Sequence, residues 1–104
     1  MSDYQIEIPP SFQALHLDPR RRLTMPLREL RERYELCEDL AQQLVDHARS
    51  TLFALGIAEE DVLARCHRGL LEPQQLVGTD EAVWVTRRLA ELLGWDWAGW
   101  SVEA

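Results

Sequence analysis

The chain has 104 residues, enough for one domain with a single hydrophobic core. Hydrophobic residues make up 46% of it, an ordinary fraction for a globular protein, which excludes a disordered or membrane-embedded chain. Acidic residues number 18 and basic residues 11, all of them arginine. The resulting net charge of −7 disfavours long-range attraction to nucleic acid or to anionic lipid.

The sequence also bears on compartment and redox state. No apolar run approaches the roughly 20 residues that cross a bilayer, and the segment Met1–Tyr4 does not look like a signal peptide. We therefore expect a cytoplasmic protein with no membrane partner. In that compartment the two cysteines are expected to be thiols rather than a disulfide, with Cys37 acting as a small buried hydrophobe.

Residues 1–25 are predicted to form an N-terminal arm. Tyr4, Ile6 and Ile8 alternate with polar residues, as in an extended segment, and two prolines at 9–10 then stiffen the chain. Ser11 is predicted to cap one helical turn over residues 12–15.

Three arginines at 20–22 follow the turn signal Asp18-Pro19. They are expected to lie in a solvated loop. An acidic partner, or ion pairs with the chain's own carboxylates, are the alternatives.

A long helix is predicted to run for about 30 residues from Pro26 to Leu55, or roughly 45 Å. Proline suits its first position and Gly56 its exit. Apolar or small side chains recur along it at alternating gaps of three and four, in one stripe. The stripe consists of Leu27, Leu30, Tyr34, Cys37, Ala41, Leu44, Ala48, Thr51 and Leu55. Its midpoint Leu44 is expected to be among the most damaging sites for truncation to alanine.

The apolar surface of this helix widens in its second half. The off-stripe residues are Leu36, Leu40, Val45, Leu52 and Phe53. They predict a C-terminal half that is covered on more than one side. Leu36 and Phe53 are candidate partner-binding residues, because a second copy of the chain or another protein could cover them.

Two shorter helices are predicted to pack on the long one. The first begins near residues 58–60 and ends around Gly69 and Pro73, with Val62, Leu63, Cys66 and Leu70 on its buried face. The second is predicted to be capped by Thr79 and stopped by Gly94, with Trp95 folding back on Ala90. Its predicted face consists of Ala82, Val85, Thr86, Leu89, Leu92 and Leu93.

These elements predict an all-α protein, a small helical bundle built on one long helix with two shorter helices and an extended arm. We divide it into an arm (residues 1–25), a helical domain (26–94) and a tryptophan-rich tail (95–104). The tail holds Trp95, Trp97 and Trp100, which are candidate partner-binding residues. Folding back of these rings onto the helices is the alternative.

Reactive motifs are not evident. Cys66 and His67 are adjacent, without the paired spacing of a structural zinc site. No nucleophile elbow, HExxH sequence or glycine-rich loop is present. We therefore expect no catalytic, cofactor-binding or metal-binding residues.

A DNA-binding helix-turn-helix is an alternative for the two shorter helices. The connection from Gly69 to Thr79 is longer than the three or four residues of that turn. Asp80 and Glu81 would also meet DNA with the wrong charge. No nucleic-acid partner is expected.

The segments 33–40 (RYELCEDL), 61–67 (DVLARCH) and 87–95 (RRLAELLGW) resemble a group of short proteobacterial proteins that are labelled "ATPase with chaperone activity". The resemblance extends from Ile6 to Trp95 and consists of helix-face positions. It implies an association with a chaperone machine. The chain has no lysine and no Gly-x4-Gly-Lys-Ser/Thr loop, so the usual means of binding nucleotide phosphates are missing.

The leading hypothesis is a non-enzymatic adaptor in the bacterial cytoplasm that binds another protein or itself, with a homodimer as one form. A chaperone-associated or nucleotide-dependent protein is the alternative, followed by the DNA-binding protein.

Overall fold

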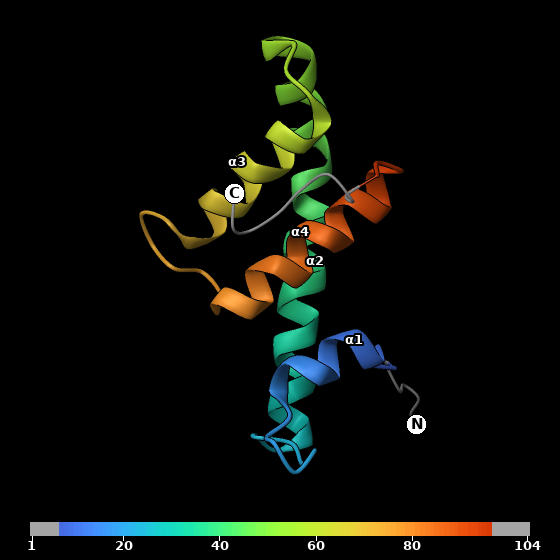
Figure 1. Cartoon of the computed structure of the whole chain (residues 1–104), viewed down its shortest axis with the longest axis vertical. Coiled ribbons are helices and arrows are strands. Elements are labelled where there is room, and N and C mark those ends of the chain that lie inside the picture. The colour runs from blue at the N-terminus through green and yellow to red at the C-terminus, as the bar shows by residue number, and fades with distance from the viewer. Residues whose placement is uncertain (1–6, 97–104) are drawn as a thin grey trace. The chain divides into compact units, whose positions relative to one another are not determined.

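The computed structural model describes residues 7–96, and all regular structure within this range is helical (Figure 1). The helices are α1 (Pro10–Gln13), the short 3-10 helix η1 (Ala14–His16), α2 (Leu27–Leu55), α3 (Glu59–Leu71) and α4 (Thr79–Leu93). The all-α prediction is confirmed, and so is the long helix as one continuous element. None of the described helices is both long enough and apolar enough to cross a membrane.

The chain divides into two compact units, Met1–Leu36 and Cys37–Ala104, with the boundary inside α2. In the first unit Phe12 is fully buried, and its ring meets the Tyr34 ring edge-on with the centroids 5.6 Å apart. The helical turn predicted over residues 12–15 is present, but Ser11 is a helical residue rather than its cap. Pro9 takes that place, since its carbonyl accepts the N–H groups of Phe12 and Gln13 at 3.0 and 3.1 Å.

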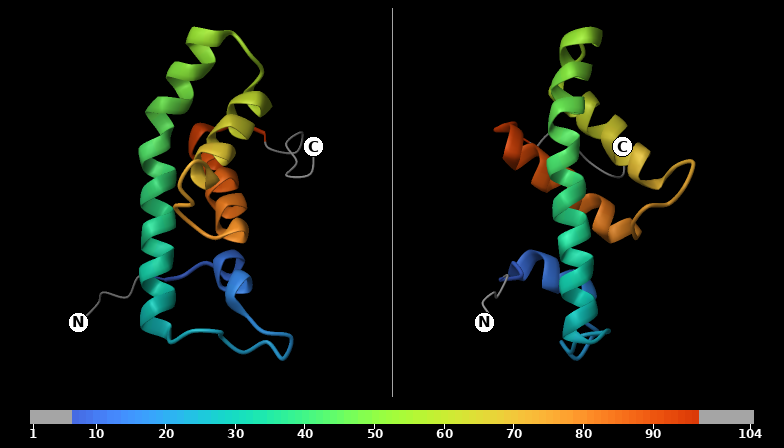
Figure 2. Two further views of the ribbon diagram at one scale, coloured as in Figure 1. Left: turned by 90° about the vertical axis from the view of Figure 1, so that its left-hand side faces the viewer. Right: turned by 180° about the vertical axis from the view of Figure 1, so that it is seen from behind.

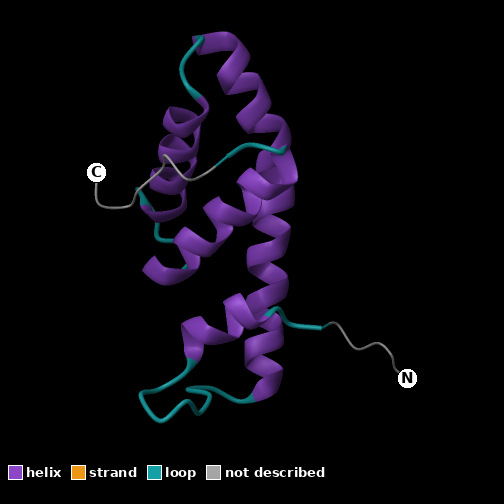
Figure 3. Cartoon of the chain, turned by 45° about the vertical axis from the view of Figure 1, so that its right-hand side comes forward, coloured by secondary structure: helices purple, strands orange, loops and turns teal. Residues whose placement is uncertain are grey.

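The arginine segment 20–22 lies in an exposed loop, as predicted, within the teal connection that precedes α2 in Figure 3. One Asp18 carboxylate oxygen orders this loop by accepting the backbone N–H groups of Arg20 and Arg22, both at 2.9 Å. The Arg22 Nε lies 3.7 Å from the other oxygen. Because 68% of the Arg22 side chain is exposed, this ion pair contributes little to stability.

In the second unit, α3 and α4 lie on the same side of the C-terminal part of α2 (Figure 2). Small and branched side chains fill the space between the three helices. The core consists of Ala48, Val62, Leu63, Cys66, Leu89 and Ala90. The predicted buried face of α3 is confirmed at all four of its positions.

One expectation about α2 is wrong. Its C-terminal half is not covered on more than one side, since Phe53 is 91% and Leu55 50% exposed. The reason is that α3 and α4 share one side of the helix. Leu44, in the predicted stripe, is half-buried and packs at the edge of the core.

The helix ends follow the sequence at glycines 56 and 94, which adopt left-handed φ angles of 62° and 74°. After α4, the Trp95 N–H donates to the Ala90 carbonyl at 2.9 Å, as predicted. Thr79, however, does not cap α4. Gly78 is the N-cap, and its N–H donates to the buried Glu81 carboxylate at 2.8 Å.

The end of α3, predicted around Gly69 and Pro73, lies between these residues, because the helix continues to Leu71. Pro73 causes the stop. A residue before proline avoids helical backbone, and Glu72 is accordingly extended.

An ion pair joins α2 to α4 within the second unit. Arg88 donates from two nitrogens to the two oxygens of Glu38, at 2.9 and 3.1 Å, across 50 residues of sequence. Gln42 donates to the same carboxylate at 2.9 Å. Burial alone would raise the pKa of Glu38, but the hydrogen bonds from Arg88 and Gln42 and the Arg88 charge outweigh it and lower this pKa.

We expect Leu89→Ala to destabilise the protein by about 2–5 kcal/mol, because the fully buried side chain leaves a cavity in the core. Phe53→Ala should change the free energy of unfolding by no more than about 0.5 kcal/mol, since the ring is exposed. Urea denaturation followed by circular dichroism measures both. Equal losses for the two variants would contradict this placement of the core.

We expect Glu38→Gln to lower the free energy of unfolding by about 1 kcal/mol at pH 7. The folded-state pKa of Glu38 lies below its usual value of 4.5, so the ion pair stabilises above that value. The difference between wild type and variant should therefore vanish as the pH falls through the folded-state pKa. Urea denaturation at pH 7 and pH 3 tests this, with the exposed neighbour Asp39→Asn as control. A loss that is independent of pH would argue against the pair.

Candidate functional site

A small cleft opens between α2 and α3, entirely within the second unit. Its volume is about 270 Å³. Helix α2 contributes Leu40, Gln43, Leu44 and His47, helix α3 contributes Arg65, Cys66, Gly69 and Leu70, and the following loop contributes Leu76. We call this the α2–α3 cleft.

The sequence builds the cleft by helical spacing. Leu40, Leu44 and His47 lie three or four residues apart, on one face of α2. Arg65 and Gly69 have the same relation on α3, which runs back beside α2 after the turn at Gly56 (Figure 2). The result is an apolar interior with polar side chains at its edge.

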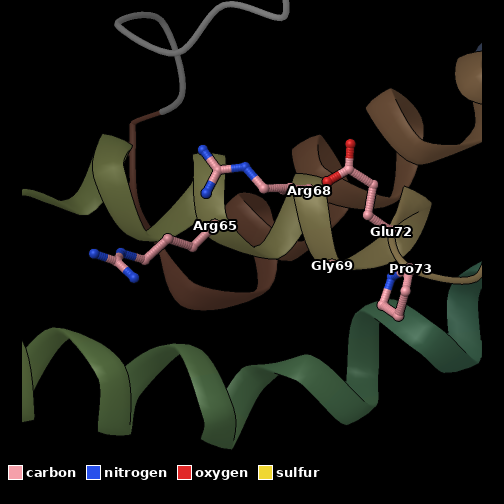
Figure 4. Close-up of a pocket in the computed structure, with 5 residues that line it drawn as sticks. All are labelled: Arg65, Arg68, Gly69, Glu72 and Pro73. Carbon is pink, nitrogen blue, oxygen red and sulfur yellow. The ribbon is translucent and has the colours of Figure 1, made fainter.

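A second, open depression adjoins the cleft along α3, with a volume of about 600 Å³. Arg65, Arg68, Gly69, Glu72 and Pro73 line it, and we call it the α3 trough (Figure 4). In this view the guanidinium groups of Arg65 and Arg68 extend toward the N-terminal end of α3. The Glu72 carboxylate extends from the same side of the helix as the Arg68 side chain. Arg65 and Gly69 belong to both hollows, so an apolar cleft and a charged trough meet at these two residues.

The trough arginines stand out in an acidic part of the chain. Residues 37–104 contain five arginines and twelve aspartates and glutamates, whereas residues 1–36 contain six of each kind. Arg88 is held by Glu38 and Glu91. Within residues 7–96 the side chains of Arg65 and Arg68 make neither a hydrogen bond nor an ion pair. Their guanidinium groups therefore present donors to solvent.

Gly69 has no packing role within the described chain. It lies inside α3 with helical backbone, and a Cβ built on it would meet no atom within 4 Å. Glycine inside a helix is less stable than alanine by roughly 0.5–1 kcal/mol. The bare backbone at this position makes room at the junction of the cleft and the trough.

Two neighbouring titratable residues, Cys66 and His67, lie at or beside the cleft. Burial raises the pKa of the Cys66 thiol, so it stays protonated at neutral pH and is a weak nucleophile. Burial also lowers the pKa of the neighbouring His67. Among residues 7–96 no three His, Cys, Asp or Glu side chains are grouped to hold a metal ion. Cys37 and Cys66 are not joined in a disulfide.

The structure describes three of the five residues proposed from sequence as partner-binding, and these three are divided between the two units. Leu36 is 38% exposed and belongs to the first unit, while Phe53 is 91% exposed and belongs to the second. Trp95 is half-buried and packs against the core of the second unit. Trp97 and Trp100 lie outside the described residues.

The cleft was not predicted from the sequence, because its lining residues form no motif. One signal was available. A glycine well inside a predicted helix, with arginines one and four residues before it, lacks an obvious structural purpose.

Comparison of the chain with protein-family models, with curated proteins and with solved structures found no match. The function is therefore argued from the geometry of the cleft and the trough.

Proposed function

We propose that the protein is a non-enzymatic interaction module that binds a segment of another protein in the α2–α3 cleft. The observation behind this proposal is Gly69, a helical glycine at the point where an apolar cleft meets a charged trough. A residue that weakens its own helix without easing any internal contact is explained by close approach of a binding partner.

The size and lining of the cleft support a side chain as its occupant. Pockets for small ligands usually measure roughly 300–1,000 Å³, and the cleft, at about 270 Å³, falls just below that range. Its leucines at 40, 44, 70 and 76 favour an apolar group. Leu76, 49% exposed at the edge, adds apolar surface that a partner would cover.

The setting of the module remains part of the proposal. We place it in the bacterial cytoplasm as an adaptor, and the resemblance over residues 33–40, 61–67 and 87–95 makes a chaperone-associated protein one class of partner. Self-association is a second candidate, supported by the exposed Phe53 ring and its neighbour Leu55.

We expect Gly69→Ala to raise the free energy of unfolding by about 0.5–1 kcal/mol, because alanine restricts the unfolded chain and its methyl group meets nothing in the folded one. Urea denaturation measures the gain. Gly94→Ala is the control and should destabilise by about 1–2 kcal/mol, since its φ of 74° is unfavourable for alanine. A loss of stability at Gly69 would show that glycine serves the fold, and would remove the main support for the cleft as a binding site.

Photo-crosslinking in the cell that makes the protein tests the proposal directly. A photoreactive amino acid placed at Leu76 should give a discrete adduct with another protein, whereas one at Ser50, exposed on α2 and outside the cleft, should give none. A third position, Phe53, reports self-association through adducts between two copies of the chain. If Leu76 and Ser50 label the same proteins equally, the cleft is not the binding site.

A further inference from the structure

We infer that the partner segment seated in the α2–α3 cleft is acidic, with a bulky apolar side chain close to two carboxylates. This inference rests on the proposed function and specifies the chemistry of its ligand. The apolar side chain enters the cleft, and the carboxylates take the guanidinium groups of Arg65 and Arg68 in the adjoining trough.

The side chains of Arg65 and Arg68 are available to bind a ligand. Each guanidinium carries five donors in a planar fork that matches a carboxylate. The side chains of Arg65 and Arg68 make no hydrogen bond or ion pair with residues 7–96, although Asp61 and Glu72 lie four residues from them on the helix face. Their donors are therefore free for a ligand.

The separation of Arg65 and Arg68 on α3 suits a ligand with two carboxylates. Residues three apart on a helix lie about one turn from each other, with Cβ atoms roughly 5–6 Å apart. A partner with acidic residues one helical turn apart, or two positions apart in an extended strand, matches this distance. Gly69, one residue beyond Arg68, lets the partner's backbone approach α3 while its apolar side chain turns toward Leu44 and Leu70.

The net charge of the chain does not oppose this recognition. Salt at physiological strength screens exposed charges beyond about 8 Å, so the contacting arginines decide the sign of the interaction. Among residues 7–96, Glu72 is the one carboxylate that lines the trough. It reduces the local positive charge, and its neutralisation by Glu72→Gln should strengthen the binding of an acidic segment.

The test starts from selection of binders out of a random peptide library displayed against the full chain, followed by fluorescence anisotropy of the selected peptides. We expect each peptide to combine a bulky apolar residue with nearby Asp or Glu. Reversing both charges, Arg65→Glu with Arg68→Glu, should weaken binding at least about tenfold. Arg49→Glu makes one such charge reversal on α2, outside both hollows, and should leave the affinity unchanged.

Two further measurements separate the possible failures. Selection against the doubly reversed variant should enrich Lys and Arg in place of Asp and Glu. Peptides that are blocked by Gly69→Trp but show no acidic preference would overturn the acidic ligand and retain the cleft. Peptides indifferent to Gly69→Trp would overturn the proposed function itself. If ATP with magnesium displaces the peptides at micromolar concentration, the arginines bind phosphate, and the acidic-segment proposal is wrong.

Discussion

The structure of the second unit depends on small buried side chains where its three helices pack together, and on the close approach of α3 to α4. Ala48 of α2 and Ala90 of α4 are fully buried, and Cys66 of α3 is nearly so. Side chains of this size allow neighbouring backbones to lie near each other, with Leu63 and Leu89 filling the remaining space. Dispersion and the hydrophobic effect therefore act over a compact contact surface, and the stability of a short chain depends on a few fully buried residues.

The same close packing determines where the ion pair and the cleft can lie. Arg88 of α4 reaches Glu38 of α2, and this pair joins the two helices. Beyond the core, α3 and α2 have longer side chains between them, and the leucines at 40, 44 and 70 do not fill the gap. The cleft thus lies at the edge of the core, where the side chains of α2 and α3 are larger than alanine and do not fill the space between the two helices.

Much of this fold was predictable from the sequence because it follows local rules. The long stripe, the four buried positions of α3 and the stops at glycines 56 and 94 follow from periodicity and from the backbone freedom of glycine. The errors concern which neighbour an element meets. Threonine and glycine are about equally preferred as N-caps, and the Glu81 carboxylate, which accepts the Gly78 N–H, favours Gly78 in that position. Phe53 continues an apolar pattern, but two short helices on one side of α2 cannot also cover it.

The site was harder to predict, since a hollow is made by side chains from separate elements. Leu76 and His47 are 29 positions apart, and nothing in the local pattern of either residue places them at one cleft. Gly69 is the exception, because its conformational disadvantage is a property of one residue and can be recognised without knowing the fold.

Two features of α3 depart from what selection for stability alone would favour. Gly69 lowers the stability of its own helix, and the side chains of Arg65 and Arg68 have no ion-pair partner among residues 7–96 although they lie in an acidic unit. Either departure by itself has ordinary explanations, because exposed arginines are common and helices tolerate an occasional glycine. Their meeting at the junction of an apolar cleft and a charged trough is what a binding surface requires. In the binding mode that we propose, the glycine admits the partner's backbone, the cleft takes an apolar side chain, and the arginines select its charge.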